Sequence, residues 1–235
     1  MYTPLNLIGH SMGAGVACTY AGVYPESVLS LVMVEGAGPL SRSEGSVVRH
    51  LRENVDKRVL SNNSLFGEKR RARTYKSVEK AVDARVATAG GFPGEQYISR
   101  EAAERLVVRG TRPVGAAGAA VTAAGAVEFS HDKRLQWPSL SYFSEAQVLS
   151  IMRSVTAPVK ILKAEDGWPP GDAVDGGETE RERRMEALER VEVVEVKGSH
   201  HCHADPGTVE ECGREIVEHF YGRGGASLAS LASKL

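Results

Sequence analysis

A glycine-rich turn between an apolar run and a helical pattern constrains this chain more than any other feature. Residues 5–8 are mostly apolar, which predicts a short buried strand, and residues 9–13 spell G-x-S-x-G. Behind the turn, small and apolar residues recur at helical spacing until Gly22 and Pro25 stop the helix. The chain therefore begins with a strand, a sharp turn and a helix, and the turn carries Ser11.

Ser11 lies at the apex of that turn, which predicts a strained backbone and an exposed hydroxyl. We expect glycine to be needed at Gly9 and Gly13 because a side chain there would collide across the turn. The start of the following helix directs N–H groups toward a developing oxyanion, and the N–H of Met12 is the expected donor. A nucleotide-binding turn would need G-x-G-x-x-G, which these residues do not spell. The pattern is typical of a nucleophilic serine.

Composition excludes several function classes. The 235 residues carry a formal net charge of -1, which gives no electrostatic reason to expect nucleic acid or an acidic membrane surface as a partner. No apolar run approaches the length of a membrane span, and the first residues lack the features of a signal peptide. The three cysteines, Cys18, Cys202 and Cys212, are widely spaced, which disfavours a disulfide scaffold and favours a reducing compartment.

Alternating strand and helix patterns predict an α/β architecture with a parallel sheet. The apolar run at residues 28–35 follows the first helix at a spacing that predicts a right-handed crossover. Two further strands are expected at residues 158–164 and 191–196, with a helix between them. We expect four segments: core sheet with the serine turn at 1–39, an inserted helical lid at 40–135, core sheet carrying the acid and histidine at 136–222, and a flexible targeting tail at 223–235.

Three chemically suitable side chains follow the ends of these strands. Ligand-binding groups gather at the carboxyl ends of parallel strands, and Ser11, Asp166 and His200 all come just after such ends. In this arrangement His200 would take the serine proton and return it to the leaving group, while a carboxylate on its other ring nitrogen would fix the tautomer. We therefore predict a catalytic triad of Ser11, His200 and Asp166.

The residues leave alternatives for two of these roles. Glu165 and Asp132 compete with Asp166 as the acid, because each is a loop carboxylate and position alone supports the choice. His203 is the alternative base, and His200 is preferred because it directly follows a Gly-Ser turn.

The stretch after the last strand also holds metal-ligand residue types. It contains His200, His201, Cys202, His203 and Asp205. Adjacent side chains at a strand end point in different directions, and no second pair of ligands stands elsewhere in the sequence. We therefore expect no metal and no other cofactor, and we expect His10 to serve packing.

Several motifs along the chain are shared with one known superfamily. They are Leu7-Ile8-Gly9-His10-Ser11-Met12-Gly13, Lys69-Arg70-Arg71, Arg109-Gly110-Thr111, Asp132-Lys133-Arg134-Leu135, Ile161-Leu162-Lys163-Ala164 and Val194-Glu195-Val196-x-Gly198-x-His200. With them the chain resembles the α/β-hydrolase superfamily and, within it, the serine hydrolase-like (Kraken-like) proteins of eukaryotes. The resemblance implies the α/β-hydrolase fold, with Ser11 and His200 matching the nucleophile and the base.

The family's N-terminal strands, and the His-Gly loop that supplies a second oxyanion N–H, have no counterpart here, so we expect an N-terminally truncated form. The resemblance implies a serine hydrolase that cleaves an ester or thioester of a small acyl substrate through an acyl-enzyme. Losing one oxyanion donor costs roughly two to three orders of magnitude in rate. The alternative is therefore a catalytically impaired homologue that acts as a binding module or is not stable alone.

The last three residues, Ser233-Lys234-Leu235, match the C-terminal tripeptide that the peroxisomal import receptor reads. A glycine-rich spacer precedes them, and the unpaired cysteines agree with a reducing compartment. We expect a peroxisomal location, with the cytoplasm as the alternative.

Deleting Leu235 should leave a fluorescent fusion of this chain in the cytosol, because the import receptor needs the complete exposed tripeptide. Fluorescence microscopy of the full-length and shortened fusions checks this. An unchanged punctate pattern after the deletion would exclude import through this tail.

Overall fold

A computed structural model describes residues 4–62, 73–94, 96–114, 125–132, 135, 139–168 and 178–222. The chain divides into two units. The first comprises Met1–Ser43, Pro93–Gln96 and Phe143–Leu235, and the second comprises Glu44–Phe92 and Tyr97–Tyr142. The predicted targeting residues Ser233, Lys234 and Leu235 lie outside the described residues, as does the Lys69-Arg70-Arg71 run.

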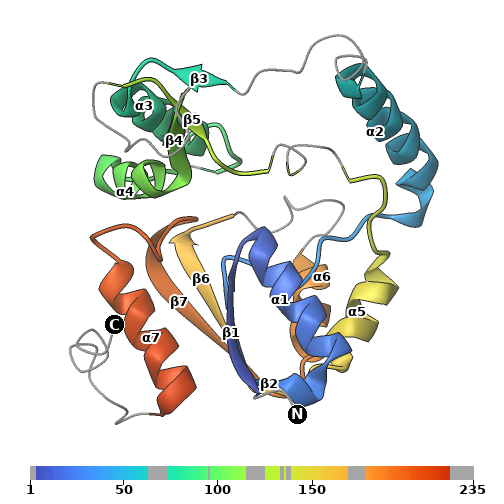
Figure 1. Ribbon diagram of the computed structural model, residues 1–235. Coiled ribbons are helices and arrows are strands. Elements are labelled where there is room, and N and C mark those ends of the chain that lie inside the picture. Colours follow the sequence, from blue (N-terminus) through green and yellow to red (C-terminus); the bar gives the residue numbers. More distant parts are fainter. Residues whose placement is uncertain are drawn as a thin grey trace. The chain divides into compact units, whose positions relative to one another are not determined.

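The first unit is built on a sheet of four parallel strands (Figure 1). In spatial order these are β1 (Leu5–His10), β2 (Val28–Val34), β6 (Val159–Asp166) and β7 (Val191–Ser199). Ile8 is in register with Val32, and Val34 is in register with Leu162. Because all the strands run in one direction, the segments that follow them meet along the same edge.

Helices cover both faces of this sheet (Figure 1). One face carries α1 (Met12–Val23), α5 (Glu145–Arg153) and α6 (Glu178–Glu186), the other carries α7 (Val209–Tyr221), and the short η1 (Pro25–Ser27) links α1 to β2. Leu31 and Met33 of β2 pack into the core with α1 and α5. Val32 and Val34 pack into the core with α7, as the alternation of a strand requires. The predicted parallel sheet flanked by helices is confirmed.

The second unit combines helices with a small antiparallel sheet. Its helices are η2 (Glu44–Ser46), α2 (Val47–Asn62), α3 (Val78–Ala89) and α4 (Arg100–Gly110), and its strands, in spatial order, are β3 (Thr74–Tyr75), β5 (Val127–Phe129) and β4 (Thr111–Pro113). The Ser77 and Ser99 side chains cap α3 and α4. The sequence patterns did not reveal this sheet, because strands of two or three residues are too short for a periodic signal.

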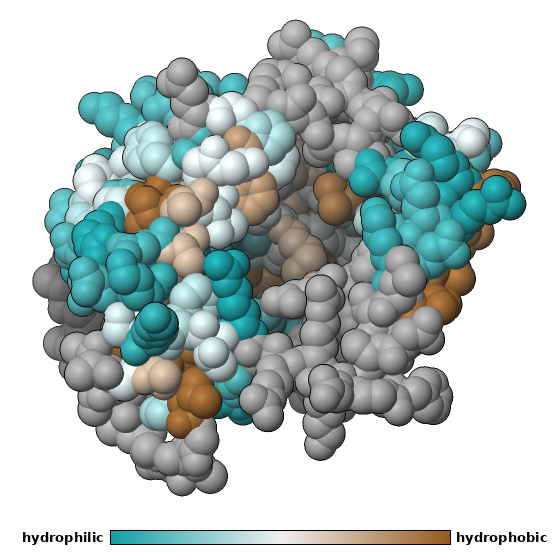
Figure 2. All heavy atoms as spheres, turned by 90° about the horizontal axis from the view of Figure 1, so that it is seen from above, coloured by the Kyte–Doolittle hydropathy of each residue, from teal (hydrophilic) through white to brown (hydrophobic). Residues whose placement is uncertain are grey.

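The surface of α2 is mostly hydrophilic, with hydrophobic patches at its border (Figure 2). Its exposed apolar side chains at helical spacing include Val48, Leu51, Val55 and Val59. Among the described residues, no helix has both the length and the apolar character needed to cross a bilayer.

Candidate active site

The backbone at Ser11 is strained between β1 and α1. Its φ of 54° and ψ of -121° lie where few residues with a side chain are found. A Cβ at Gly9 would overlap the carbonyl of Gly13, which confirms the collision expected there. The same expectation is wrong at Gly13, because a Cβ there would meet no described heavy atom within 4 Å. The half-buried serine therefore lies on the sharp turn that the sequence predicted.

Two backbone groups define the surroundings of Ser11. The Ser11 N–H donates to the Val34 carbonyl at 2.9 Å, which ties the turn to the end of the neighbouring strand β2. Met12 is the first residue of α1, so its N–H has no acceptor within the helix. This N–H lies beside the serine at the positive end of the helix dipole, as an oxyanion donor must.

A buried carboxylate contacts the histidine after β7. Glu35 directly follows β2 with a φ of 51°, and its side chain is 3% exposed. One Glu35 oxygen accepts from the Ala164 N–H at 2.7 Å, and the other accepts from the Trp168 N–H at 3.2 Å. That second oxygen also lies 3.2 Å from His200 Nδ1. Glu35 therefore holds the position on the His200 ring that the acid of a catalytic triad occupies.

The ionisation of Glu35 follows from these contacts. Burial raises the pKa of its carboxyl, but the hydrogen bonds from His200, Ala164 and Trp168 outweigh burial and hold the pKa below its usual value. The group is therefore a carboxylate at neutral pH. A carboxylate beside Nδ1 keeps the proton on that nitrogen and leaves His200 Nε2 as the basic atom.

The carboxylates that the sequence suggested lie elsewhere. Asp166 and Glu165 are exposed. Both lie within β6, because that strand continues two residues past its expected end, where Asp166 pairs with Ser199. Asp132 is an exposed residue of the second unit. The structure thus brings Glu35, and not Asp166, to His200 Nδ1.

Gln96 links the two loops that carry these groups. Its Nε2 donates to the carbonyls of Asp166 and Gly167 at 3.0 and 2.8 Å, and its Oε1 accepts from the His200 N–H at 3.0 Å. Trp168 from the same loop meets the His200 ring edge to face, with centroids 5.6 Å apart. Sequence reasoning missed Gln96, because an isolated glutamine outside any motif carries no signal.

Three further histidines gather beside His200. The His10 Nε2–H donates to the His200 carbonyl at 2.7 Å, and the His10 and His203 ring centroids are 4.1 Å apart. Burial, together with the nearby His203, lowers the pKa of His10 to about 3, although its hydrogen bond to His200 raises it. Burial also lowers the pKa of His203, with a smaller effect from His200. His10 therefore contacts the site, whereas the sequence suggested only packing.

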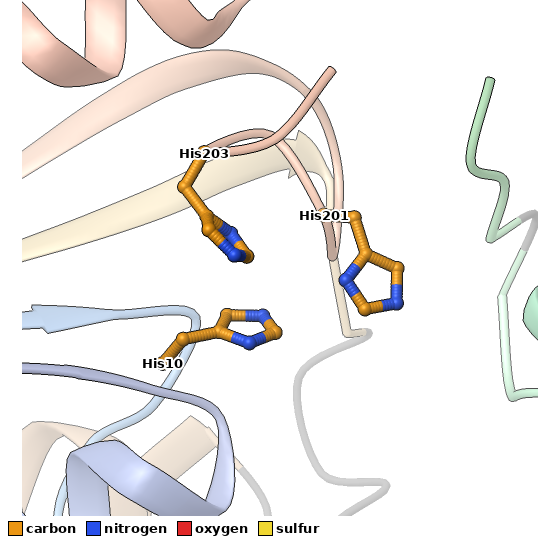
Figure 3. Close-up of side chains that lie close together, drawn as sticks. All are labelled: His10, His201 and His203. Carbon is orange, nitrogen blue, oxygen red and sulfur yellow. The ribbon is translucent and has the colours of Figure 1, made fainter. Parts of the chain in front are cut away.

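One nitrogen atom each from His10, His201 and His203 lies within 4.8 Å of the other two (Figure 3). His203, the alternative base, has a buried Nδ1 with no hydrogen-bond partner among the described residues. A base needs an acceptor on this nitrogen to fix its tautomer, so the geometry favours His200 over His203.

Comparisons with known proteins identify the superfamily to which this fold belongs. Residues 2–103 match the family model described as alpha/beta hydrolase fold. The serine hydrolase-like protein of Danio rerio is 27% identical over 198 residues, which make up 84% of this chain and 55% of that protein. The crystal structure of a hypothetical protein from Pseudomonas aeruginosa is 30% identical, with a TM-score of 0.73, and the match covers 94% of this chain and 69% of that one.

A thioesterase domain from the curacin biosynthetic pathway has the same fold at 19% identity, with a TM-score of 0.61 over 92% of this chain and 66% of that one. The chain belongs to the α/β-hydrolase superfamily and is similar to serine hydrolase-like proteins. It spans about half the length of the curated Danio rerio relative.

Gly167→Ala should destabilise the first unit, because the added Cβ would overlap the Glu35 carboxylate oxygens. We expect a loss of about 1–3 kcal/mol in the free energy of unfolding, measured by urea denaturation. Gly207→Ala is the matched control, since a Cβ at Gly207 would meet no described atom within 4 Å. Its effect should stay within about 0.5 kcal/mol.

A double-mutant cycle identifies the origin of this loss. Gly167→Ala should cost less in a Glu35→Ala background, because the overlapping carboxylate is gone, and the coupling should be about 0.5–3 kcal/mol. An equal cost in both backgrounds would contradict a direct conflict between these two residues.

Proposed function

We propose that this chain carries the catalytic centre of a serine hydrolase that cleaves an ester or thioester of a small acyl substrate. Ser11 is the nucleophile, His200 the base, Glu35 the acid, and the Met12 N–H an oxyanion donor. The contact of the buried Glu35 carboxylate with His200 Nδ1, at the sheet edge that also carries the strained Ser11, is the observation on which the proposal rests. Membership of the α/β-hydrolase superfamily supports it.

The first half of the reaction transfers the acyl group to the serine. His200 Nε2 accepts the proton from Ser11 Oγ as that oxygen bonds to the carbonyl carbon of the substrate. The carbonyl oxygen becomes an oxyanion, which accepts the Met12 N–H. When the carbonyl re-forms, the bond to the alcohol or thiol breaks, and the leaving group takes the proton from His200.

The second half restores the enzyme. Water loses a proton to His200 as it attacks the acyl carbon, and the carboxylic acid leaves as Ser11 Oγ regains a proton. Glu35 stays ionised throughout and stabilises the imidazolium that forms twice in the cycle. Its three hydrogen bonds keep it in position and balance its charge within a buried site.

A fluorophosphonate probe tests the proposal because Ser11 Oγ would displace its fluoride and form a stable bond to phosphorus. The wild-type chain should be labelled, and Ser11→Ala should not. Glu35→Gln should slow labelling on the order of 10³–10⁴-fold, as the corresponding acid-to-amide change does in serine proteases. Asp166→Asn is the matched control and should label at nearly the wild-type rate. Quantified gel fluorescence against time gives these rates.

Circular dichroism of each variant establishes that it is folded. If the folded wild-type chain shows no labelling that depends on Ser11, the hydrolase proposal fails for this chain, and a binding role for the fold takes its place. If Asp166→Asn slows labelling and Glu35→Gln does not, the acid has been assigned to the wrong residue.

A further inference from the structure

His10, His201 and His203 form a cluster that the proposed reaction does not use. His10 ends β1, whereas His201 and His203 belong to the turn that follows β7. The three rings converge from these two segments onto one small volume (Figure 3). Their ring centroids are 4.1 Å apart for His10 and His203, 5.3 Å for His10 and His201, and 6.1 Å for His201 and His203.

One polar atom of this cluster is in an unusual state for a protein interior. His203 Nδ1 is buried and has no hydrogen-bond partner among the described residues. Buried polar nitrogens are normally paired, so an unpaired one within a cluster of imidazoles needs an explanation. The His10 ring is already held in orientation by its hydrogen bond to the His200 carbonyl at 2.7 Å. Metal-binding histidines are commonly fixed by such a contact to a backbone carbonyl.

The donor set selects a class of ligand. Three imidazoles without a carboxylate suit zinc, copper or nickel, whereas magnesium and calcium require oxygen ligands. Three histidines and one water form a common tetrahedral arrangement around zinc. Cys202 lies between two of these histidines in sequence, but its side chain is buried with Cys212 in the core against α7.

The spacing of the nitrogens is close to what such an ion needs. Zinc–nitrogen bonds of about 2.0–2.1 Å in a tetrahedron place the ligand atoms roughly 3.3 Å apart. The three nitrogens now lie within 4.8 Å of one another. Because His201 and His203 belong to a turn, we expect their side-chain torsions, and not the strands, to adjust when an ion binds.

We propose that His10, His201 and His203 form a binding site for a divalent transition-metal ion, with Zn²⁺ completed by one water as the expected occupant. The ion would join the end of β1 to the turn after β7. β1 and β7 are the two outer strands of the four-stranded sheet. The sequence suggested no metal because the turn after β7 alone lacks a second set of ligands, and His10 supplies the missing ligand from a strand far away in the sequence.

Zn²⁺ titration of the metal-free chain against a chromogenic zinc chelator tests the site. The experiment uses the Ser11→Ala variant, so its outcome does not depend on hydrolase activity. One Zn²⁺ should bind per chain, and an equal concentration of Mg²⁺ should not compete. His203→Gln and His201→Gln should each weaken Zn²⁺ binding by a larger factor than loss of an outer-shell contact does. Such a loss costs roughly 10–100-fold in metal affinity. His131→Gln, at an exposed histidine of the second unit, is the control and should bind normally.

Two readouts complete the test. Zn²⁺ should raise the unfolding temperature of the Ser11→Ala chain, because the ion binds the folded state, and this rise should vanish in His203→Gln. Co²⁺ in place of Zn²⁺ should give no intense near-ultraviolet thiolate band. The proposal would be overturned if Zn²⁺ did not bind one-to-one, or if Co²⁺ gave a thiolate band. It would also be overturned if His201→Gln and His203→Gln both bound Zn²⁺ as tightly as the Ser11→Ala chain while keeping its metal-free unfolding temperature.

Discussion

The buried carboxylate of Glu35 is the constraint on which the geometry of the sheet edge depends. It receives hydrogen bonds from Ala164 in β6, from Trp168 in the following loop and from His200 after β7. A carboxylate taken out of water is stable only when such partners surround it, so these segments must keep their places together. Gly167 leaves the space that the carboxylate fills, and Gln96 ties the same two loops to each other.

The parallel topology connects this carboxylate to the strained serine. β2 lies between β1 and β6, so its end adjoins both the Ser11 turn and the loop behind β6. The Ser11 N–H donates to the carbonyl of Val34, which immediately precedes Glu35. One backbone hydrogen bond thus relates the proposed nucleophile to the proposed acid. Among the described residues other than glycine, only Ser11 and Glu35 have a positive φ, and each directly follows a strand of the sheet.

The sequence predicted local features well and tertiary relations poorly. The G-x-S-x-G turn and the apolar run of β2 depend on neighbouring residues, so their patterns were sufficient. Glu35 was missed because it read as the last residue of a buried strand, although a charged residue that ends an apolar run before Gly36 was an available signal. Gln96 and the pairing of His10 with His203 depend on segments brought together only by the folded topology.

Proton NMR of the His200 Nδ1–H tests the central assignment of Glu35 as the charged partner of His200 most directly. A ring N–H that donates to a buried carboxylate resonates far downfield of the amide region, and His200→Gln assigns the signal by removing it. We expect this signal in the wild-type chain and in Asp166→Asn, and we expect its loss in Glu35→Gln. A signal that persists in Glu35→Gln and disappears in Asp166→Asn would contradict this assignment.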